Sequence, residues 1–228
     1  MRISTFPREG RILLLALIVF MLSSCLTAKN LDKYVAKQYN NELPKLAKKK
    51  RQEIDVMQAN TPSTAISTTI HKIDKFLPLL VYWKYNHRQS CSLNPTIAVT
   101  QFTNTVNAVA NKSFTDKLAG RKLELTVEQA PAAFSIVAKE QMIWLIYAFS
   151  WSKIYIEPEA KDLVVSYKLT DNGSANKTGT ITVKNTEKNR GIRMFQSWKS
   201  ATSEYLAEYN ATLTNLTKSF VNQLTQEL

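Results

Sequence analysis

The stretch FQSWKSATSEYLAEYNATLTNLTKSFVNQLTQEL, residues 195–228, contains neither proline nor glycine. Large apolar and aromatic side chains recur in it at intervals of three and four residues, which places them on one face of a helix. These residues are Tyr205, Tyr209, Leu213, Leu216, Phe220 and Leu224, preceded by Thr202. The pattern is the strongest helix signal in the chain, and it predicts a long C-terminal helix with one buried stripe.

Two segments before this helix alternate between apolar and polar residues, as half-buried strands do. In KLELTVE, residues 122–128, every second residue from Leu123 to Val127 is apolar. In residues 162–185, two alternating arms flank the turn-forming sequence DNGS at 171–174. This arrangement predicts a β-hairpin.

The region upstream mixes strand and helix signals. Residues 96–102 predict a strand because they are rich in β-branched types. Asn104 is expected to cap a following helix that ends at Gly120, because glycine readily takes the left-handed backbone conformation. Residues 31–51 predict an earlier helix, kinked at Pro44 because proline removes a backbone donor.

The order of these elements defines the fold class. With at least two strands expected in residues 53–85, the chain predicts an α+β fold, a two-layer sandwich of a mainly antiparallel sheet with helices on one face. The element order over residues 96–228 resembles accessory lipoproteins of envelope transport. Examples are the lipopolysaccharide-assembly lipoprotein, auxiliary lipoproteins of lipid transporters, and the N-terminal part of the curli-secretion lipoprotein. The resemblance rests on element order and assigns no residue a role.

The N-terminal segment combines a basic start with a short apolar run. Arg2, Arg8 and Arg11 precede or border ILLLALIVFML, residues 12–22. A bilayer-spanning helix needs about 20 apolar residues, so the run indicates a cleaved signal peptide rather than an anchor. We expect the signal peptide to be residues 1–24.

The residues that follow resemble the lipobox of bacterial lipoproteins, in the order Leu22, Ser23, Ser24 and Cys25. The resemblance implies cleavage before Cys25, diacylation of its sulfur and acylation of the new N-terminus. Two or three acyl chains hold a protein at a membrane almost permanently. The alternative is an ordinary signal peptide followed by a chance cysteine. We expect residues 25–30 to form a lipidated linker and residues 31–228 a single α+β domain.

The position after the lipobox bears on localisation. Leu26 stands where, in enteric bacteria, an aspartate tends to retain a lipoprotein in the inner membrane. Residues 27–30 lack the acidic cluster that resembles a surface-export signal. The sequence therefore favours an outer-membrane, lipid-anchored protein that faces the periplasm.

The charge balance is strongly basic, with 30 Lys and Arg against 18 Asp and Glu and a formal net charge of +12. Removing the leader takes away three arginines and one glutamate, which leaves 12 − 2 = +10. Lys45 and residues 48–51 concentrate charge near the anchor, where it suits anionic lipid headgroups; a solvated helix end is the alternative. No nucleic-acid-binding signature accompanies the charge, so we expect no nucleic acid partner. Cys91 is left as a lone thiol, expected to be buried.

Signals for catalysis are weak. His71 and His87 are the only histidines, and their spacing from Cys91 fits neither a metal site nor a nucleophile with its base. The five glycines are too few for a phosphate-binding loop. Glu157 and Glu159 are better explained as part of a solvated turn than as a glycosidase pair. We therefore expect a non-enzymatic protein without metal or cofactor.

One aromatic segment is a candidate for binding. MIWLIYAFSWSKIYI, residues 142–156, has Lys153 as its only charge and is too short to span a membrane comfortably. It predicts either a buried strand pair or an apolar groove that receives an acyl chain or a partner protein, with residues 78–85 as the other wall. The candidate surface consists of aromatic residues, namely Trp144, Tyr147, Phe149, Trp151, Tyr155, Tyr82 and Trp83.

These features predict an outer-membrane lipoprotein that binds an envelope protein or lipid, as an accessory subunit of an envelope assembly or transport system. A periplasmic enzyme acting on glycans or lipids is one alternative. A surface adhesin component is another.

Overall fold

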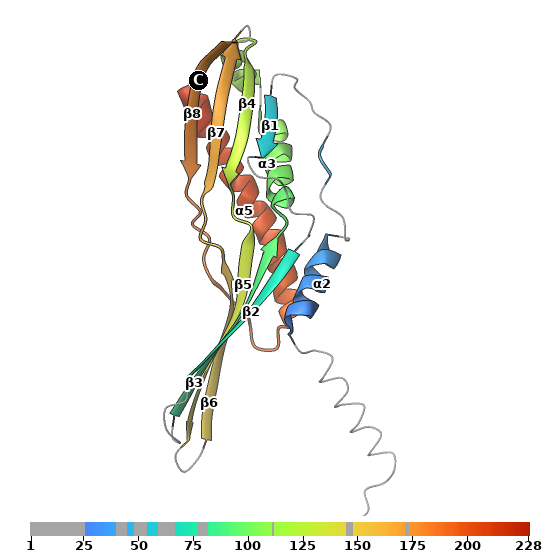
Figure 1. Cartoon of the computed structure of the whole chain (residues 1–228), viewed down its shortest axis with the longest axis vertical. Coiled ribbons are helices and arrows are strands. Elements are labelled where there is room, and N and C mark those ends of the chain that lie inside the picture. Colours follow the sequence, from blue (N-terminus) through green and yellow to red (C-terminus); the bar gives the residue numbers. More distant parts are fainter. Residues whose placement is uncertain are drawn as a thin grey trace, which may run out of the picture.

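The computed structural model describes residues 26–39, 45–47, 54–58, 67–76, 82–110, 112–144, 148–171 and 174–228. Its strands form two sheets (Figure 1). The four-stranded sheet has the order β1 (Ile54–Gln58), β4 (Lys122–Gln129), β7 (Leu163–Asp171), β8 (Ser174–Val183). The five-stranded sheet has the order β2 (Ser67–Phe76), β3 (Tyr82–Leu93), β5 (Ala133–Trp144), β6 (Ala148–Pro158), β9 (Arg190–Gly191).

Helices cover one face of these sheets, and all strand pairs except β1 with β4 are antiparallel. The helices are α2 (Ala28–Gln38), α3 (Pro95–Val109), α4 (Lys112–Leu118) and α5 (Trp198–Glu227). The predicted α+β class and the long C-terminal helix are confirmed. Among the described residues, no helix is long and apolar enough to cross a bilayer.

The structure divides the predicted single sheet in two at a seam marked by prolines. Pro131 lies between β4 and β5, and Pro158 ends β6. Proline has no N–H to donate, so a strand ladder tends to stop at such positions. Other groups take over the hydrogen bonds there: the Ala132 N–H donates to Glu159 Oε2 (2.9 Å), and the Tyr209 hydroxyl donates to the Pro131 carbonyl (2.8 Å).

Helix α5 packs against both sheets and joins their cores (Figure 1). From its start to Leu213, it contributes Ala201, Tyr205, Leu206, Tyr209 and Leu213 to the core over the five-stranded sheet. Its second half contributes Leu216, Phe220, Val221 and Leu224 to the core over the four-stranded sheet. Every residue of the predicted stripe is buried. One 30-residue helix therefore supports both halves of the molecule.

The local predictions have mixed outcomes. In β4 and the β7–β8 hairpin the alternation is confirmed, with every second side chain buried from Leu123 to Val127 and from Leu163 to Leu169. Gly120 follows α4 with φ +79°, as expected of a residue that ends a helix. The helix predicted over 31–51 is α2, which ends at Gln38; Pro44 lies outside the described residues.

The strand predicted over residues 96–102 is wrong, because this segment begins helix α3. The Asn94 side chain accepts a hydrogen bond from the Thr96 N–H (2.9 Å), and Pro95 occupies the first helical turn. This cap and proline outweigh the β-branched composition. Asn104 is therefore not a cap. It lies within α3, where its amide bonds the Ala47 N–H (2.8 Å) and the Lys45 carbonyl (3.2 Å).

Candidate functional site

Strands β3, β5 and β6 extend beyond the helices as a projecting ribbon (Figure 1). Their register aligns the two segments predicted to form opposite walls of a groove. Tyr82 stands opposite Ile143, which stands opposite Phe149, and Trp83 stands opposite Met142. The predicted walls are therefore adjacent in the sheet.

The described structure covers the predicted surface only in part. Cys25 and Tyr147 lie outside the described residues. The strands include the backbones of Tyr82, Trp83, Trp144 and Phe149, while their side chains are outside the description.

The two remaining aromatic candidates behave differently. Trp151 is 47% exposed on β6. Tyr155, four residues on and on the same face of the strand, is buried, and the Lys139 ammonium lies 5.4 Å from its ring centroid. Of these two side chains, Trp151 alone is available to a ligand or partner.

An apolar hollow of about 590 Å³ lies on the other face of the ribbon, where it joins the body. Its floor is a row across three strands: His87 on β3 stands opposite Ala138 on β5, which stands opposite Ile154 on β6. Ile136 extends the floor and the walls include Leu26, the first described residue. The walls also include Ile192, Gln196 and Ser197 from the segment before α5, and Trp198 and Lys199 from its first turn.

A second, basic hollow of about 420 Å³ adjoins the apolar one. Trp198 and Lys199 line both hollows, so the Trp198 side chain stands between them. The rings of Tyr34 and Trp198 pack edge to face, with their centroids 5.5 Å apart, and this contact holds the indole against α2. The remaining lining comes from α2: Asn30, Lys33, Lys37 and Gln38. An apolar compartment and a cationic one therefore share a wall.

The paired hollows match the chemistry of an amphipathic anion. Aliphatic side chains with an indole suit a hydrocarbon chain, and volumes of this size are typical of small-molecule sites. The lysine ammonium groups suit a phosphate or carboxylate headgroup.

The titratable groups with shifted pKa values lie elsewhere. Burial raises the pKa of Tyr39 to about 12, and it raises the pKa of Tyr205 and of Tyr209. Burial, followed by the nearby Glu208, also raises the pKa of Glu187, which lines a separate hollow beside α5. None of these four groups lines the apolar hollow. Among the described residues, no group of three or more His, Cys, Asp or Glu is placed to hold a metal ion.

The sequence predicts a binding surface close to this site, but none of the predicted candidate residues whose side chains the structure describes lines the apolar hollow. The aromatic segment contains Ile154, but the candidates chosen from it flank that residue. Leu26 and Trp198 lie about 170 positions apart in the chain and carry no shared pattern. Only the strand register and the packing of α2 and α5 bring these residues together.

Comparison with protein-family models, with curated proteins and with solved structures finds no match.

Trp151→Ala is expected to leave the fold intact, with a loss of unfolding free energy of at most about 1 kcal/mol, because the side chain is half exposed. Urea unfolding followed by circular dichroism measures this loss. If the ring contacts a partner, affinity capture with the variant should recover less of that partner at unchanged stability. A loss of several kcal/mol would instead mean that Trp151 is a core residue.

Proposed function

We propose that this protein is a non-enzymatic lipoprotein of the bacterial outer membrane that faces the periplasm and binds an acyl chain of an anionic envelope lipid. Acyl chains on Cys25 would anchor it. Binding of this kind fits an accessory subunit of a lipid-handling envelope system.

The observation that carries the proposal is the pair of hollows divided by Trp198. The apolar hollow would take the hydrocarbon chain, where each buried CH₂ contributes about 0.8 kcal/mol. Lys33, Lys37 and Lys199 would hold the anionic headgroup on the other side of the indole. Binding then requires both parts of an amphipathic ligand.

The position of the site supports the same conclusion. Leu26 lines the apolar hollow and is the residue after Cys25. An anchor at residue 25 would therefore hold the hollow against the membrane surface. Tethering raises the effective concentration of membrane lipids at the site without any new contact.

Photo-cross-linking tests this function in the intact, acylated protein. Vesicles would contain a phosphatidylglycerol with a photoreactive diazirine in its acyl chain, and mass spectrometry would locate the adducts. We expect adducts on the peptides that contain Ile154 and Trp198. Ala138→Trp should reduce the yield of adducts more than tenfold. An indole that keeps even two CH₂ groups of the acyl chain out of the hollow weakens binding by about 1.6 kcal/mol.

A matched control is Ser152→Trp, which adds the same ring to an exposed position on the same face of the ribbon, opposite Glu140. It should leave the adducts unchanged. Ile154→Asp is a second test variant, since its position is 39% exposed and accepts a carboxylate while making the floor polar. Full labelling in both test variants, or adducts scattered over the surface, would contradict lipid binding in the hollow.

A further inference from the structure

The loop between β9 and α5 exposes two adjacent large apolar side chains. Met194 is 85% exposed and Phe195 is 97% exposed. The backbone of Phe195 has φ +69°, in the left-handed region that residues other than glycine seldom adopt. Such a conformation persists only where the surrounding structure imposes it, and it is frequent at functional sites.

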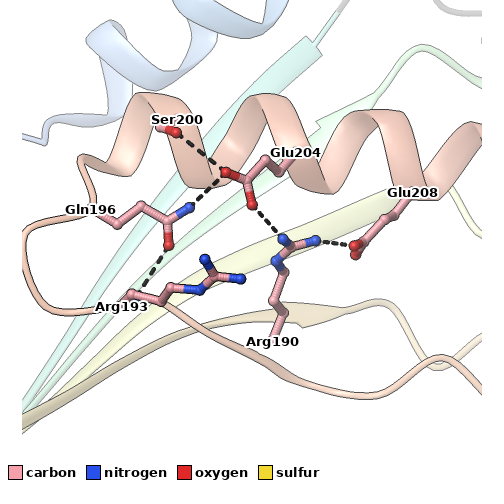
Figure 2. Close-up of polar contacts among 6 residues, drawn as sticks. All are labelled: Arg190, Arg193, Gln196, Ser200, Glu204 and Glu208. Atoms are coloured by element: carbon pink, nitrogen blue, oxygen red, sulfur yellow. Dashed lines mark hydrogen bonds and ion pairs between the residues drawn. The ribbon is translucent and has the colours of Figure 1, made fainter.

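Polar contacts with α5 hold this loop in place (Figure 2). The Gln196 amide donates to Glu204 Oε1 (3.0 Å) and accepts from the Arg193 N–H (3.1 Å). The Arg190 guanidinium pairs with both Glu204 and Glu208 (Figure 2). These contacts fix the loop in a conformation that exposes Met194 and Phe195 to solvent, although the backbone of Phe195 is strained.

The loop lies beside the start of α2 (Figure 1), near the point where the anchor would enter. Ile192 and Gln196, on either side of the exposed pair, share the apolar hollow with Leu26. The neighbouring elements are rich in basic residues: Arg193 in the loop, Lys199 in the first turn of α5, and Lys29, Lys33 and Lys37 in α2. Asp32 is the only acidic residue in α2, and Glu204 and Glu208 are engaged by Arg190.

We propose that Met194 and Phe195 insert into the surface of an anionic lipid bilayer, with the surrounding cations on its headgroups. Apolar side chains at a loop tip gain by leaving water, and basic residues near a negatively charged surface add attraction. Among the other exposed large apolar residues that the structure describes, Ile154 lines the apolar hollow and Trp151 lies on the opposite face of β6. Met57 lies on β1, in the other sheet. The inference rests on the proposed anchor at Cys25 and extends it, because insertion turns the hollow towards the bilayer.

The test uses the full acylated protein in vesicles, with an NBD fluorophore on Met194→Cys. Cys91 is buried and Cys25 would be acylated, so the label is selective. In vesicles containing phosphatidylglycerol we expect blue-shifted emission and quenching by lipids with a nitroxide in the acyl chain. Adding Phe195→Asp should lower this quenching at least fivefold. A label on Met57→Cys, half exposed on the other sheet, is the matched control and should stay unquenched.

The outcomes separate this inference from the proposed function. If the protein floats with vesicles while the Met194→Cys label stays in water, the insertion is refuted and the anchor stands. Equal insertion into phosphatidylcholine and phosphatidylglycerol vesicles would refute the role of the cations. A protein that does not float with either vesicle lacks the anchor, and this inference fails with it.

Discussion

Phe220→Ala is expected to lower the free energy of unfolding by about 3 to 5 kcal/mol, the usual cost of truncating a buried phenylalanine. Phe220 is fully buried in α5 over the four-stranded sheet, and its ring centroid lies 5.5 Å from that of Phe102 in α3. The truncation removes this ring contact and leaves a cavity between two helices and the sheet. Urea unfolding measures the change as a shift of the midpoint.

Phe134→Ala should cost about as much, although Phe134 belongs to the other core, where its ring centroid lies 4.8 Å from that of Tyr205. Because α5 joins both cores, each variant should unfold in a single transition seen alike by all probes. Lys218→Ala, an exposed change two residues from Phe220, is the control and should stay within about 0.5 kcal/mol of the wild type. Two separate transitions in either core variant would show that the helix does not couple the sheets.

Cys25→Ser is expected to release the protein from membranes, with a fall of more than 100-fold in the ratio of bound to free protein. Serine offers no thiol for thioether formation, so the diacylglycerol cannot be attached. Losing even four buried CH₂ groups removes about 3 kcal/mol, which already exceeds 100-fold. The acyl chains implied by the proposed lipidation are longer, so the loss of membrane binding should be close to complete.

Flotation of cell membranes, with incorporation of an alkyne-tagged palmitate, provides the measurement. Cys91→Ala is the matched control, since it removes the buried thiol in the core and leaves the lipobox untouched. This control should remain labelled and membrane-bound. An unmodified thiol at residue 25 in intact-mass data, or unchanged flotation of Cys25→Ser, would show that the lipobox resemblance is misleading.

The elements predicted well from sequence are those whose signal is local. The stripe from Thr202 to Leu224 and the alternation in β4 need no knowledge of distant residues. Residues 96–102 were mispredicted because β-branched residues occur in both strands and helices, and the nearby Asn94 and Pro95 decide between the two. The split into two sheets depends on Pro131 and Pro158, whose effect appears only once the pairing of strands is known.

The candidate site is harder to predict because its residues come from segments that are far apart in the sequence and meet only in the folded chain. Alternation along β6 puts Trp151 and Tyr155 on one face and Ile154 on the other, and no local signal tells which face carries the hollow. From sequence, Trp198 is one residue of the segment predicted to form the C-terminal helix. Its role as a partition depends on Tyr34, which lies in another helix.

The length of α5 also sets how far the protein reaches. With 30 residues at a rise of about 1.5 Å each, the helix measures about 45 Å from end to end. If the loop before α5 rests on the bilayer, as proposed, the far end of the helix and the four-stranded sheet packed on it lie up to about 45 Å from the lipid surface. Under the same proposal, a partner located away from the membrane would contact this sheet while the two hollows stayed close to the lipid.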